Sequence, residues 1–155
     1  MLIRSASGLR GIAKDHFTPE LIDKYISAFI NTQNIKSCVI GRDGRPSGKQ
    51  IALWVIDSLH KKGVNVDNCG LATTPTMQIM TEKENYDGGI VITASHNPSE
   101  YNGLKFLQND GTFLSPEQCE ELFKVVDQNI SVENSESLGL VLDYSTANKE
   151  HIHKV

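Results

Sequence analysis

The stretch Gly89-Ile90-Val91-Ile92-Thr93, followed at once by Ala94-Ser95-His96-Asn97-Pro98, predicts a buried strand that ends in a polar turn. A short apolar run that begins at a glycine and stops at a turn closed by proline is typical of such a strand. In α/β sheets, ligand sites lie outside the carboxyl ends of the strands, which is where this turn would sit. We therefore interpret Ser95 as a candidate nucleophile or phosphoryl acceptor, with His96 and Asn97 as hydrogen-bond donors beside it.

The segments around this strand alternate between helical periodicity and short apolar runs. Helices are expected at about residues 19–32, 48–62, 74–84 and 116–128, and strands at about residues 37–41, 64–72, 89–93 and 103–107. Thr18, Ser47 and Ser115 are expected to cap helices, and Gly63 to stop one. The turn Asn109-Asp110-Gly111 requires a glycine with positive φ. This alternation predicts a three-layer α/β/α sandwich with a mixed, mostly parallel sheet of about four strands.

The end of the chain changes character. Residues 129–137 are polar and are interpreted as a linker or a strand edge, and residues 139–143 are one more candidate strand. Tyr144 to Val155 begins as a helical pattern without a cap or stop signal, which favours a truncation over a frayed tail. We accordingly assign residues 1–140 to one domain and residues 141–155 to a linker or the start of a truncated interdomain segment.

Composition limits the class of partner and the compartment. With 155 residues the chain fits one domain, and its net charge of -4 argues against a nucleic-acid or anionic-membrane partner, since either requires a basic face. Neither a secretion signal nor a membrane-spanning apolar window is present in the sequence. Cys38, Cys69 and Cys119 form no CxxC pair, so we expect reduced, buried thiols and a cytoplasmic protein.

Two other chemistries fit the residues poorly. A Ser-His-Asp hydrolase lacks its GxSxG turn here, and because adjacent residues point in different directions, His96 is badly placed to accept the proton of Ser95. The segment around Lys49 resembles a Walker A loop only superficially, because Asp43 occupies the first glycine position and Gln50 follows the lysine, so no nucleotide binding is predicted. The remaining histidines are interpreted as surface residues: His16, His60, His151 and His153.

Four segments in order resemble a known family. Thr93-Ala94-Ser95-His96-Asn97-Pro98 is similar to the phosphoserine loop of the α-D-phosphohexomutases, which include phosphoglucomutase, phosphomannomutase and phosphoglucosamine mutase. Ser7-Gly8-Leu9-Arg10-Gly11 resembles their SGxRG element, Gly41-Arg42-Asp43-Gly44-Arg45 their G-x-D-x-R loop, and Tyr101-Asn102-Gly103-Leu104-Lys105 their N-G-x-K element. The resemblance covers essentially the whole chain and corresponds to the first domain of such an enzyme.

The resemblance implies an isomerase of carbohydrate metabolism that acts as an intramolecular phosphotransferase. Phosphorylated Ser95 would exchange its phosphoryl group with a hexose 1-phosphate or 6-phosphate through a bisphosphorylated sugar. The implied catalytic residues are Ser95, Lys105, Arg10 and His96, and the implied substrate-binding residues are Ser7, Arg10, Asn97 and Lys105. Lys105 would be the general acid/base, although a phosphoserine raises the pKa of a nearby lysine while burial lowers it, and the sequence leaves the balance open.

Two further features are the Gly41–Arg45 loop and a metal ion. For Arg42, Asp43 and Arg45 a structural ion-pair loop near the site is favoured over direct substrate contact. The resemblance implies Mg²⁺, with the phosphate of Ser95 as one ligand and the remaining aspartates from a second domain. Tyr86-Asp87-Gly88-Gly89 lacks the spaced carboxylates of that aspartate loop.

The expected partners are a hexose phosphate, a hexose 1,6-bisphosphate as activator and intermediate, and the remaining domains of the same enzyme. Without those domains, we expect the isolated chain to be inactive. The sequence does not identify the sugar of the substrate. By pattern similarity, the SGLRG and SEYNGLKF stretches favour bacterial-type phosphoglucosamine or phosphomannose/phosphoglucose enzymes. The alternative function is a stand-alone, non-catalytic phosphosugar-binding or phosphoacceptor module. A purely structural interaction domain would leave the four polar motifs unexplained.

Overall fold

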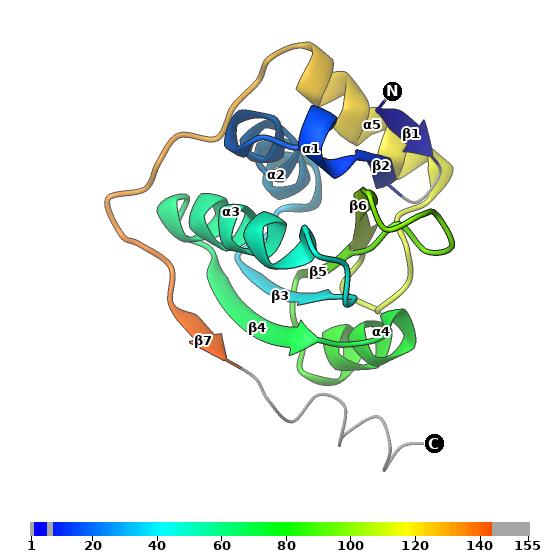
Figure 1. Ribbon diagram of the computed structural model, residues 1–155. Helices are drawn as coiled ribbons and strands as arrows, with labels where there is room; N and C mark the ends of the chain where they lie inside the picture. Colours follow the sequence, from blue (N-terminus) through cyan, green and yellow to red (C-terminus); the bar gives the residue numbers. More distant parts are fainter. Residues whose placement is uncertain (1, 6–7, 144–155) are drawn as a thin grey trace.

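The computed structural model describes residues 2–5 and 8–143, which alternate between strands and helices (Figure 1). The strands are β1 (Ile3–Ser5), β2 (Gly8–Ile12), β3 (Ser37–Arg42), β4 (Asn65–Leu71), β5 (Gly88–Ile92), β6 (Tyr101–Leu107) and β7 (Val141–Asp143). The helices are α1 (Ala13–His16), α2 (Pro19–Gln33), α3 (Gly48–Lys61), α4 (Thr74–Lys83) and α5 (Pro116–Asp127). The predicted four longer helices and four central strands are confirmed, each to within a few residues at its ends.

The sheet is mixed, as predicted, but it has seven strands in the order β1-β2-β6-β5-β3-β4-β7 and not about four. The pairings of β5 with β3, β3 with β4 and β4 with β7 are parallel. Those of β1 with β2, β2 with β6 and β6 with β5 are antiparallel, so parallel pairing accounts for half of the sheet rather than most of it. The extra strands are the short segments β1, β2 and β7, of which β7 confirms the candidate strand predicted at residues 139–143. β6 runs antiparallel because a short loop joins it to β5, whereas a parallel return needs a long crossover.

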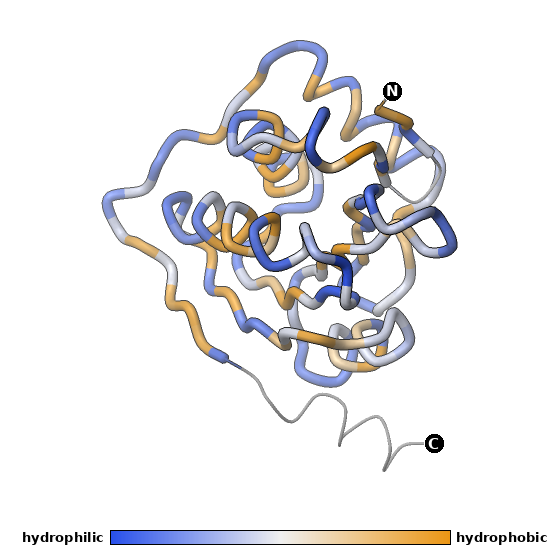
Figure 2. Tube along the Cα trace, viewed as in Figure 1, coloured by the Kyte–Doolittle hydropathy of each residue, from blue (hydrophilic) through white to orange (hydrophobic). Residues whose placement is uncertain are grey.

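Helices cover both faces of the sheet, which confirms the three-layer arrangement. On one face α2, α3 and α5 pack together over alternate residues of the central strands, among them Ile40, Ile90, Ile92, Leu104 and Phe106. On the other face α4 packs on β3 and β5, around Val39, Met77, Met80, Val91 and Leu107. In Figure 2 the hydrophobic colour accordingly runs along the central strands and the inner sides of the helices.

The helix ends follow the capping residues in two of three predicted cases. The hydroxyls of Thr18 and Ser115 accept the amides of Leu21 and Gln118, and Ser115 belongs to a full capping box. Ser47 occupies the cap position of α3, but its hydroxyl does not cap the helix, because it accepts a hydrogen bond from Asn102 Nδ2 instead. That predicted cap is therefore wrong in its hydrogen bond although right in its position.

The two glycines expected to act as stop and turn residues do so. Gly63, which follows α3, has φ of +80°, and Gly111 in the Asn109-Asp110-Gly111 turn has φ of +83°. A residue with a Cβ adopts such a φ only at a cost, so glycine is favoured at both positions.

The polar stretch after α5 is a linker that runs back past the end of α3 before β7 joins the sheet. The amides of Ser135 and Gly139 donate to the carbonyls of Lys61 and His60. The His60 ring also lies on this linker, with Nδ1 2.6 Å from the Gly139 oxygen, so His60 is half-buried rather than freely exposed. His16 is half-buried too. The domain boundary after residue 140 stays a prediction, and the helical pattern at 144–155, with His151 and His153, lies outside the described residues.

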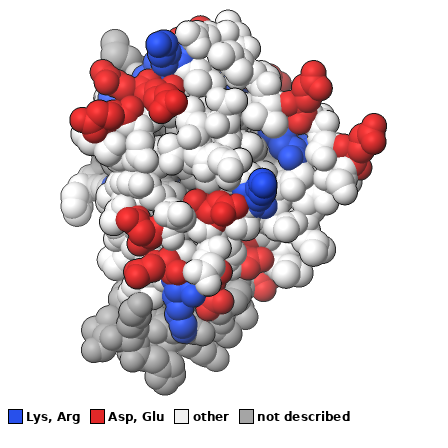
Figure 3. Space-filling view, turned by 180° about the vertical axis from the view of Figure 1, so that it is seen from behind, with Lys and Arg blue, Asp and Glu red and all other residues white. Residues whose placement is uncertain are grey.

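Cys38, Cys69 and Cys119 form no disulfide and are buried, as predicted. Burial raises the pKa of the Cys38 and Cys119 thiols and raises that of Cys69 to about 12. None of the helices within residues 2–5 and 8–143 is both long and apolar enough to cross a membrane. On the face shown in Figure 3, acidic and basic side chains are interspersed, and the described residues there form no continuous basic area.

Candidate active site

Ser95 lies where the sequence places it, in an exposed loop just beyond the carboxyl end of β5. Its φ is +53°, in the left-handed region that costs a residue with a side chain about 1–2 kcal/mol. Such a conformation persists only where the surroundings hold it. The loop residues Thr93 to Glu100 therefore present the Ser95 hydroxyl to solvent in a fixed, unusual direction.

Lys105 on β6 reaches the Ser95 hydroxyl. Leu104 and Phe106 point into the core under α2, α3 and α5, so Lys105 lies on the opposite face of the sheet, where it is half-buried. Its Nζ donates a hydrogen bond of 2.7 Å to Ser95 Oγ. The alternation of apolar and charged residues in β6 places Lys105 on the face opposite the core. On that face the side chain is directed to Ser95 and does not simply extend into solvent.

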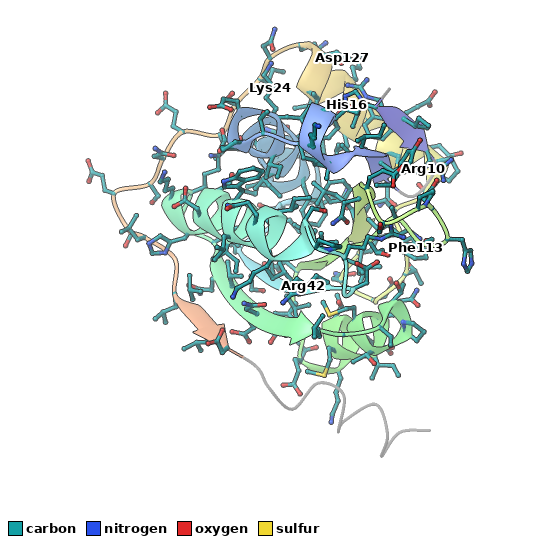
Figure 4. The ribbon with its side chains drawn as sticks, viewed as in Figure 1. Arg10, His16, Lys24, Arg42, Phe113 and Asp127 are labelled. Carbon is teal, nitrogen blue, oxygen red and sulfur yellow. The ribbon has the colours of Figure 1, made fainter. Side chains whose placement is uncertain are left out.

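Arg10 is brought to the same side by the pairing of β2 with β6. Gly8 lies opposite Lys105 and Arg10 lies opposite Gly103, so Arg10 and Lys105 are diagonal neighbours on one face of the antiparallel pair. Together with Ser5, Leu9 and the Thr93–Ser95 loop they line a small cavity of about 80 Å³. Arg10 is labelled in Figure 4 beside the β2–β6 end of the sheet.

The surroundings of Lys105 in the unphosphorylated chain lower its pKa, while the balance against a phosphoserine stays a prediction. Burial lowers the pKa of Lys105, and the positive charge of Arg10 lowers it further. Phe113, labelled in Figure 4, lies under the ammonium, with Nζ 5.5 Å from the ring centroid. The lysine beside the serine is therefore easier to deprotonate than an ordinary lysine, as suits a proton acceptor.

The Gly41–Gly48 loop holds the Ser95 loop from the other side. Arg45 Nε donates to Asp43 Oδ2 at 3.1 Å, and the hydroxyl of Thr93 donates to the same oxygen at 2.6 Å. The amide of Ser95 in turn donates to Thr93 Oγ1 at 3.0 Å. The contact between Arg45 and Asp43 confirms the ion pair expected in this loop. Arg42 is not part of it, because its guanidinium has one long hydrogen bond of 3.4 Å, to the Asp43 carbonyl.

The remaining predicted site residues have different places. Asn97 turns inward, and both its amide and its side-chain nitrogen donate to the carbonyl of Ala94. His96 is exposed, and within the described residues no hydrogen bond joins it to Ser95 or Lys105. Ser7 lies outside the described residues. Substrate contact by His96, Asn97 and Ser7 therefore stays a prediction.

Two residues with clear roles in this geometry were not singled out from the sequence. The sequence marks Thr93 only as the end of a strand and the first residue of the phosphoserine-loop motif, although a threonine directly before a turn often bonds to a nearby backbone group. Phe113 comes from a loop after β6, and its isolated bridge with Leu107 helps to bring it under Lys105. Nothing in the local sequence marks that contact.

Two glycines explain why the strands can approach so closely here. A Cβ on Gly8, whose φ is +153°, would lie 1.9 Å from the carbonyl oxygen of Leu104. A Cβ on Gly103 would lie 2.4 Å from the carbonyl oxygen of Leu9 and 2.8 Å from that of Thr93. The glycines of the SGLRG and YNGLK segments thus permit the close packing that carries Arg10 and Lys105 to Ser95.

Carboxylates for a metal are sparse near Ser95. Among residues 2–5 and 8–143, no group of three or more His, Cys, Asp or Glu side chains is arranged to hold a metal ion. Asp43 is the carboxylate nearest along the hydrogen-bond chain from Ser95, and its Oδ2 already accepts from Arg45 and Thr93. The described residues near Ser95 therefore do not complete a metal site by themselves, and an Mg²⁺ ligand on Ser95 stays a prediction.

Comparison with known proteins finds a matching family and similar sequences. Residues 1–133 match the family described as phosphoglucomutase/phosphomannomutase, alpha/beta/alpha domain I. The chain is 36% identical over 149 residues to a probable phosphoglucosamine mutase of Methanopyrus kandleri, which covers 96% of this chain and 33% of that protein. It is 43% identical over 124 residues to a phosphoglucomutase/phosphomannomutase of Thermococcus kodakarensis, covering 75% of this chain and 27% of that protein.

A solved structure agrees as well. The crystal structure of a phosphoglucomutase/phosphomannomutase family protein from Burkholderia thailandensis matches 96% of this chain and 35% of that chain, with a TM-score of 0.76 and 25% identity. The chain thus spans about a third of the length of the relatives it matches. With the match over most of its residues and the same fold, this chain belongs to the phosphoglucomutase/phosphomannomutase family and carries its α/β/α domain I.

Proposed function

We propose that this chain is the phosphoserine domain of a phosphohexomutase, in which Ser95 carries the phosphoryl group between the two ends of a hexose phosphate. The observation that carries the proposal is the 2.7 Å hydrogen bond between Lys105 Nζ and the exposed Ser95 Oγ. A lysine with a lowered pKa beside an exposed serine is suited to proton transfer at that oxygen, and Arg10 adds a positive charge for a phosphate.

The proposed cycle has two phosphoryl transfers that balance. A hydroxyl oxygen of the hexose monophosphate attacks the phosphorus of phosphorylated Ser95, the hydroxyl proton is released to solvent, and the bond from phosphorus to Ser95 Oγ breaks to leave a hexose 1,6-bisphosphate. After the sugar turns over, Ser95 Oγ attacks the other phosphate, the bond from that phosphorus to the sugar oxygen breaks, and this oxygen takes up a proton from solvent. The serine is phosphorylated again and the phosphate has changed position on the sugar.

The protonation state of Lys105 would change with the charge on Ser95 during this cycle. When Ser95 is free, burial and Arg10 lower the lysine pKa, so the amine can take the serine proton as Oγ attacks. A phosphoserine carries about -1.5 to -2 charges and favours the ammonium form again. The lysine can then return a proton to Ser95 Oγ when the phosphoryl group leaves.

Mg²⁺ is part of the proposal as the ion that neutralises charge on the transferred phosphoryl group. Ser95, through its phosphate, would hold it from this domain, and the other ligands would come from residues beyond this domain. Arg10 would bind the phosphate from the cavity side, and His96 stands at the exposed loop surface where the sugar would approach. Asn97, bonded to the Ala94 carbonyl, would contact the sugar only after turning outward. Which hexose phosphate is used stays open, because the relatives carry the names of both phosphoglucosamine mutases and phosphoglucomutase/phosphomannomutases.

The test is the intact mass of the full natural polypeptide before and after incubation with glucose 1,6-bisphosphate and Mg²⁺. We expect a gain of one phosphoryl group that is absent from Ser95→Ala. The 155-residue chain measured in parallel should show little turnover of hexose phosphates, because it spans about a third of its relatives.

Other outcomes would change the conclusion. If the folded protein binds a hexose phosphate but gains no mass, the chain is a phosphosugar-binding module and the mutase cycle is wrong. If Ser95→Ala still gains a phosphoryl group, another residue is the carrier. Rapid turnover by the 155-residue chain alone would contradict the need for further domains.

A further inference from the structure

The guanidinium of Arg45 connects both ends of the loop that carries Ser95. Nη2 donates to the carbonyl of Ser95 at 2.7 Å, and Nη1 donates to the carbonyls of Pro98 and Tyr101 at 2.6 and 3.1 Å. Nε is bound to Asp43. The side chain is only 11% exposed, so this arginine is enclosed by the loop it binds.

Both backbone groups of Ser95 are tied to the Asp43–Arg45 pair. The Ser95 carbonyl is held directly by Arg45, and the Ser95 amide is held through the Thr93 hydroxyl, which donates to Asp43 Oδ2. Groups fixed on either side of a residue restrict its φ and ψ. The left-handed conformation of Ser95, and hence the direction of its Oγ toward Lys105, depends on these bonds.

The contacts of Arg45 are of a kind that needs a guanidinium. Its planar fork offers five donors in fixed directions, and four hydrogen bonds from three of its nitrogens are used here. A lysine has a single nitrogen and cannot reach the Ser95 and Tyr101 carbonyls in the same arrangement. Arg42, three positions earlier and also half-buried, makes only its one long hydrogen bond and offers a matched comparison.

We propose that Arg45 is the positioning residue of the phosphoryl carrier: it sets the backbone of Ser95 and so controls the rate of phosphoryl transfer without binding the substrate. This inference rests on the proposed function for its kinetic part. Arg45 acts on Ser95 directly through the carbonyl and through Asp43 and Thr93 at the amide. Its loss should leave the Ser95 hydroxyl present but turned away from Lys105.

The kinetic test is the single-turnover rate at which Ser95 takes up a phosphoryl group from glucose 1,6-bisphosphate in the full natural polypeptide. Because a misplacement of about 1 Å can cost about 10²-fold in rate, we expect a loss of that order for Arg45→Ala, with a smaller change in KM. Arg42→Ala should stay near the wild-type rate. Millimolar guanidinium should restore part of the Arg45→Ala rate, which a general loss of stability would not allow, since this ion is a denaturant.

A second measurement does not depend on the reaction. In the 155-residue chain, amide hydrogen exchange at Ser95 and Asn97 should become faster in Arg45→Ala and stay unchanged in Arg42→Ala. Should Arg45→Ala fail to fold, Arg45→Lys and Thr93→Val provide the same comparison, because each breaks part of the connection and keeps the side-chain volume. Both should slow the transfer.

The outcomes separate the two proposals. If the wild-type protein takes up no phosphoryl group, the proposed function fails, while the exchange data still decide whether Arg45 holds the loop. If uptake occurs and Arg45→Ala matches Arg42→Ala in rate and in exchange, Arg45 is not a positioning residue. A slow Arg45→Ala that guanidinium does not restore, with unchanged exchange at Ser95, would also overturn the inference.

Discussion

Replacing Gly103 by alanine should disturb the site from within the sheet. Gly103 lies in β6 opposite Arg10, and its carbonyl accepts the amide of Thr93 at 3.0 Å. The backbone of Gly103 does not have a positive φ, so an alanine is excluded by space and not by conformation. The added Cβ would lie 2.4 Å from the Leu9 oxygen, 2.8 Å from the Thr93 oxygen and 3.2 Å from Arg10 Cβ.

The size of the effect follows from these distances. An ordinary contact begins at 3.4 Å, so the Leu9 carbonyl or the β6 backbone must move by about 1 Å. The obstructing atoms are backbone, which cannot rotate away as a side chain can. Overpacking of this kind costs about 1–3 kcal/mol. For a chain of this length the Tm should fall by roughly 2–12 °C, and the rate of Ser95 phosphorylation should drop by about 10²-fold because Arg10 and Thr93 move with the strands.

Gly44→Ala is the matched control. A Cβ at Gly44 would meet nothing within 4 Å, and its φ is not positive, so the alanine should be neutral or stabilise the protein by up to about 1 kcal/mol. Thermal unfolding followed by circular dichroism gives both Tm values, and intact mass against time gives the phosphorylation rate. If Gly103→Ala unfolds at the same temperature as Gly44→Ala and is phosphorylated as fast, the steric reasoning is refuted.

Other parts of the structure give further expectations. Lys105→Met should slow phosphorylation of Ser95 by about 10²–10⁴-fold with little change in Tm, and an unchanged rate measured by intact mass would rule out its acid/base role. Arg10→Gln removes a charge that lowers the Lys105 pKa, so the rate-against-pH profile of that reaction should move to higher pH; a shift to lower pH would contradict this. Ser115→Ala removes a capping box and should cost about 1 kcal/mol, seen in calorimetry as a Tm lower than that of the wild type. Arg4 lowers the pKa of Asp127, so Asp127→Asn should reduce the Tm at neutral pH, and the difference from wild type should vanish as the pH falls through that lowered pKa.

The central part of the fold could be predicted because local signals and tertiary packing agree there. An apolar run such as Ile90-Val91-Ile92 can be satisfied only inside a covered sheet, and Thr18-Pro19 or Ser115-Pro116 begins a helix by its own hydrogen bonding. The position of Ser95 follows from the same logic, because a polar turn after a buried strand must lie at the edge of the sheet. The alternation of Lys105 with Leu104 and Phe106 predicts only that the lysine lies on the face of β6 opposite the core, and its place beside Ser95 was expected from the family resemblance alone.

The parts that could not be predicted depend on contacts between distant segments. β2 contains two glycines and an arginine in five residues, so no periodicity marks it, and it becomes a strand because β6 offers it a partner. Ser47 fits a helix cap by sequence, yet Asn102, which is distant along the chain, takes its hydroxyl. The ion pair of Asp43 and Arg45 could be expected from their spacing. Its hydrogen bonds to the Ser95 loop could not, because they form only when the loop between β5 and β6 lies next to the pair.

The antiparallel β6 accounts for the properties of the site. In a wholly parallel sheet, side chains at this edge would come from strand ends and loops, which are generally more exposed. Because β6 turns back from the Ser95 loop, Lys105 stands inside the strand, opposite Val91, and its stem lies along the covered face of the sheet. Only the ammonium at the end of this side chain extends to Ser95. Burial of the lysine lowers its pKa, while Ser95 stays exposed to a substrate. The same reversal pairs β6 with β2 and brings Arg10 alongside. The departure of the sheet from parallel order is therefore what brings a lysine of lowered pKa, an arginine and an exposed hydroxyl to one edge.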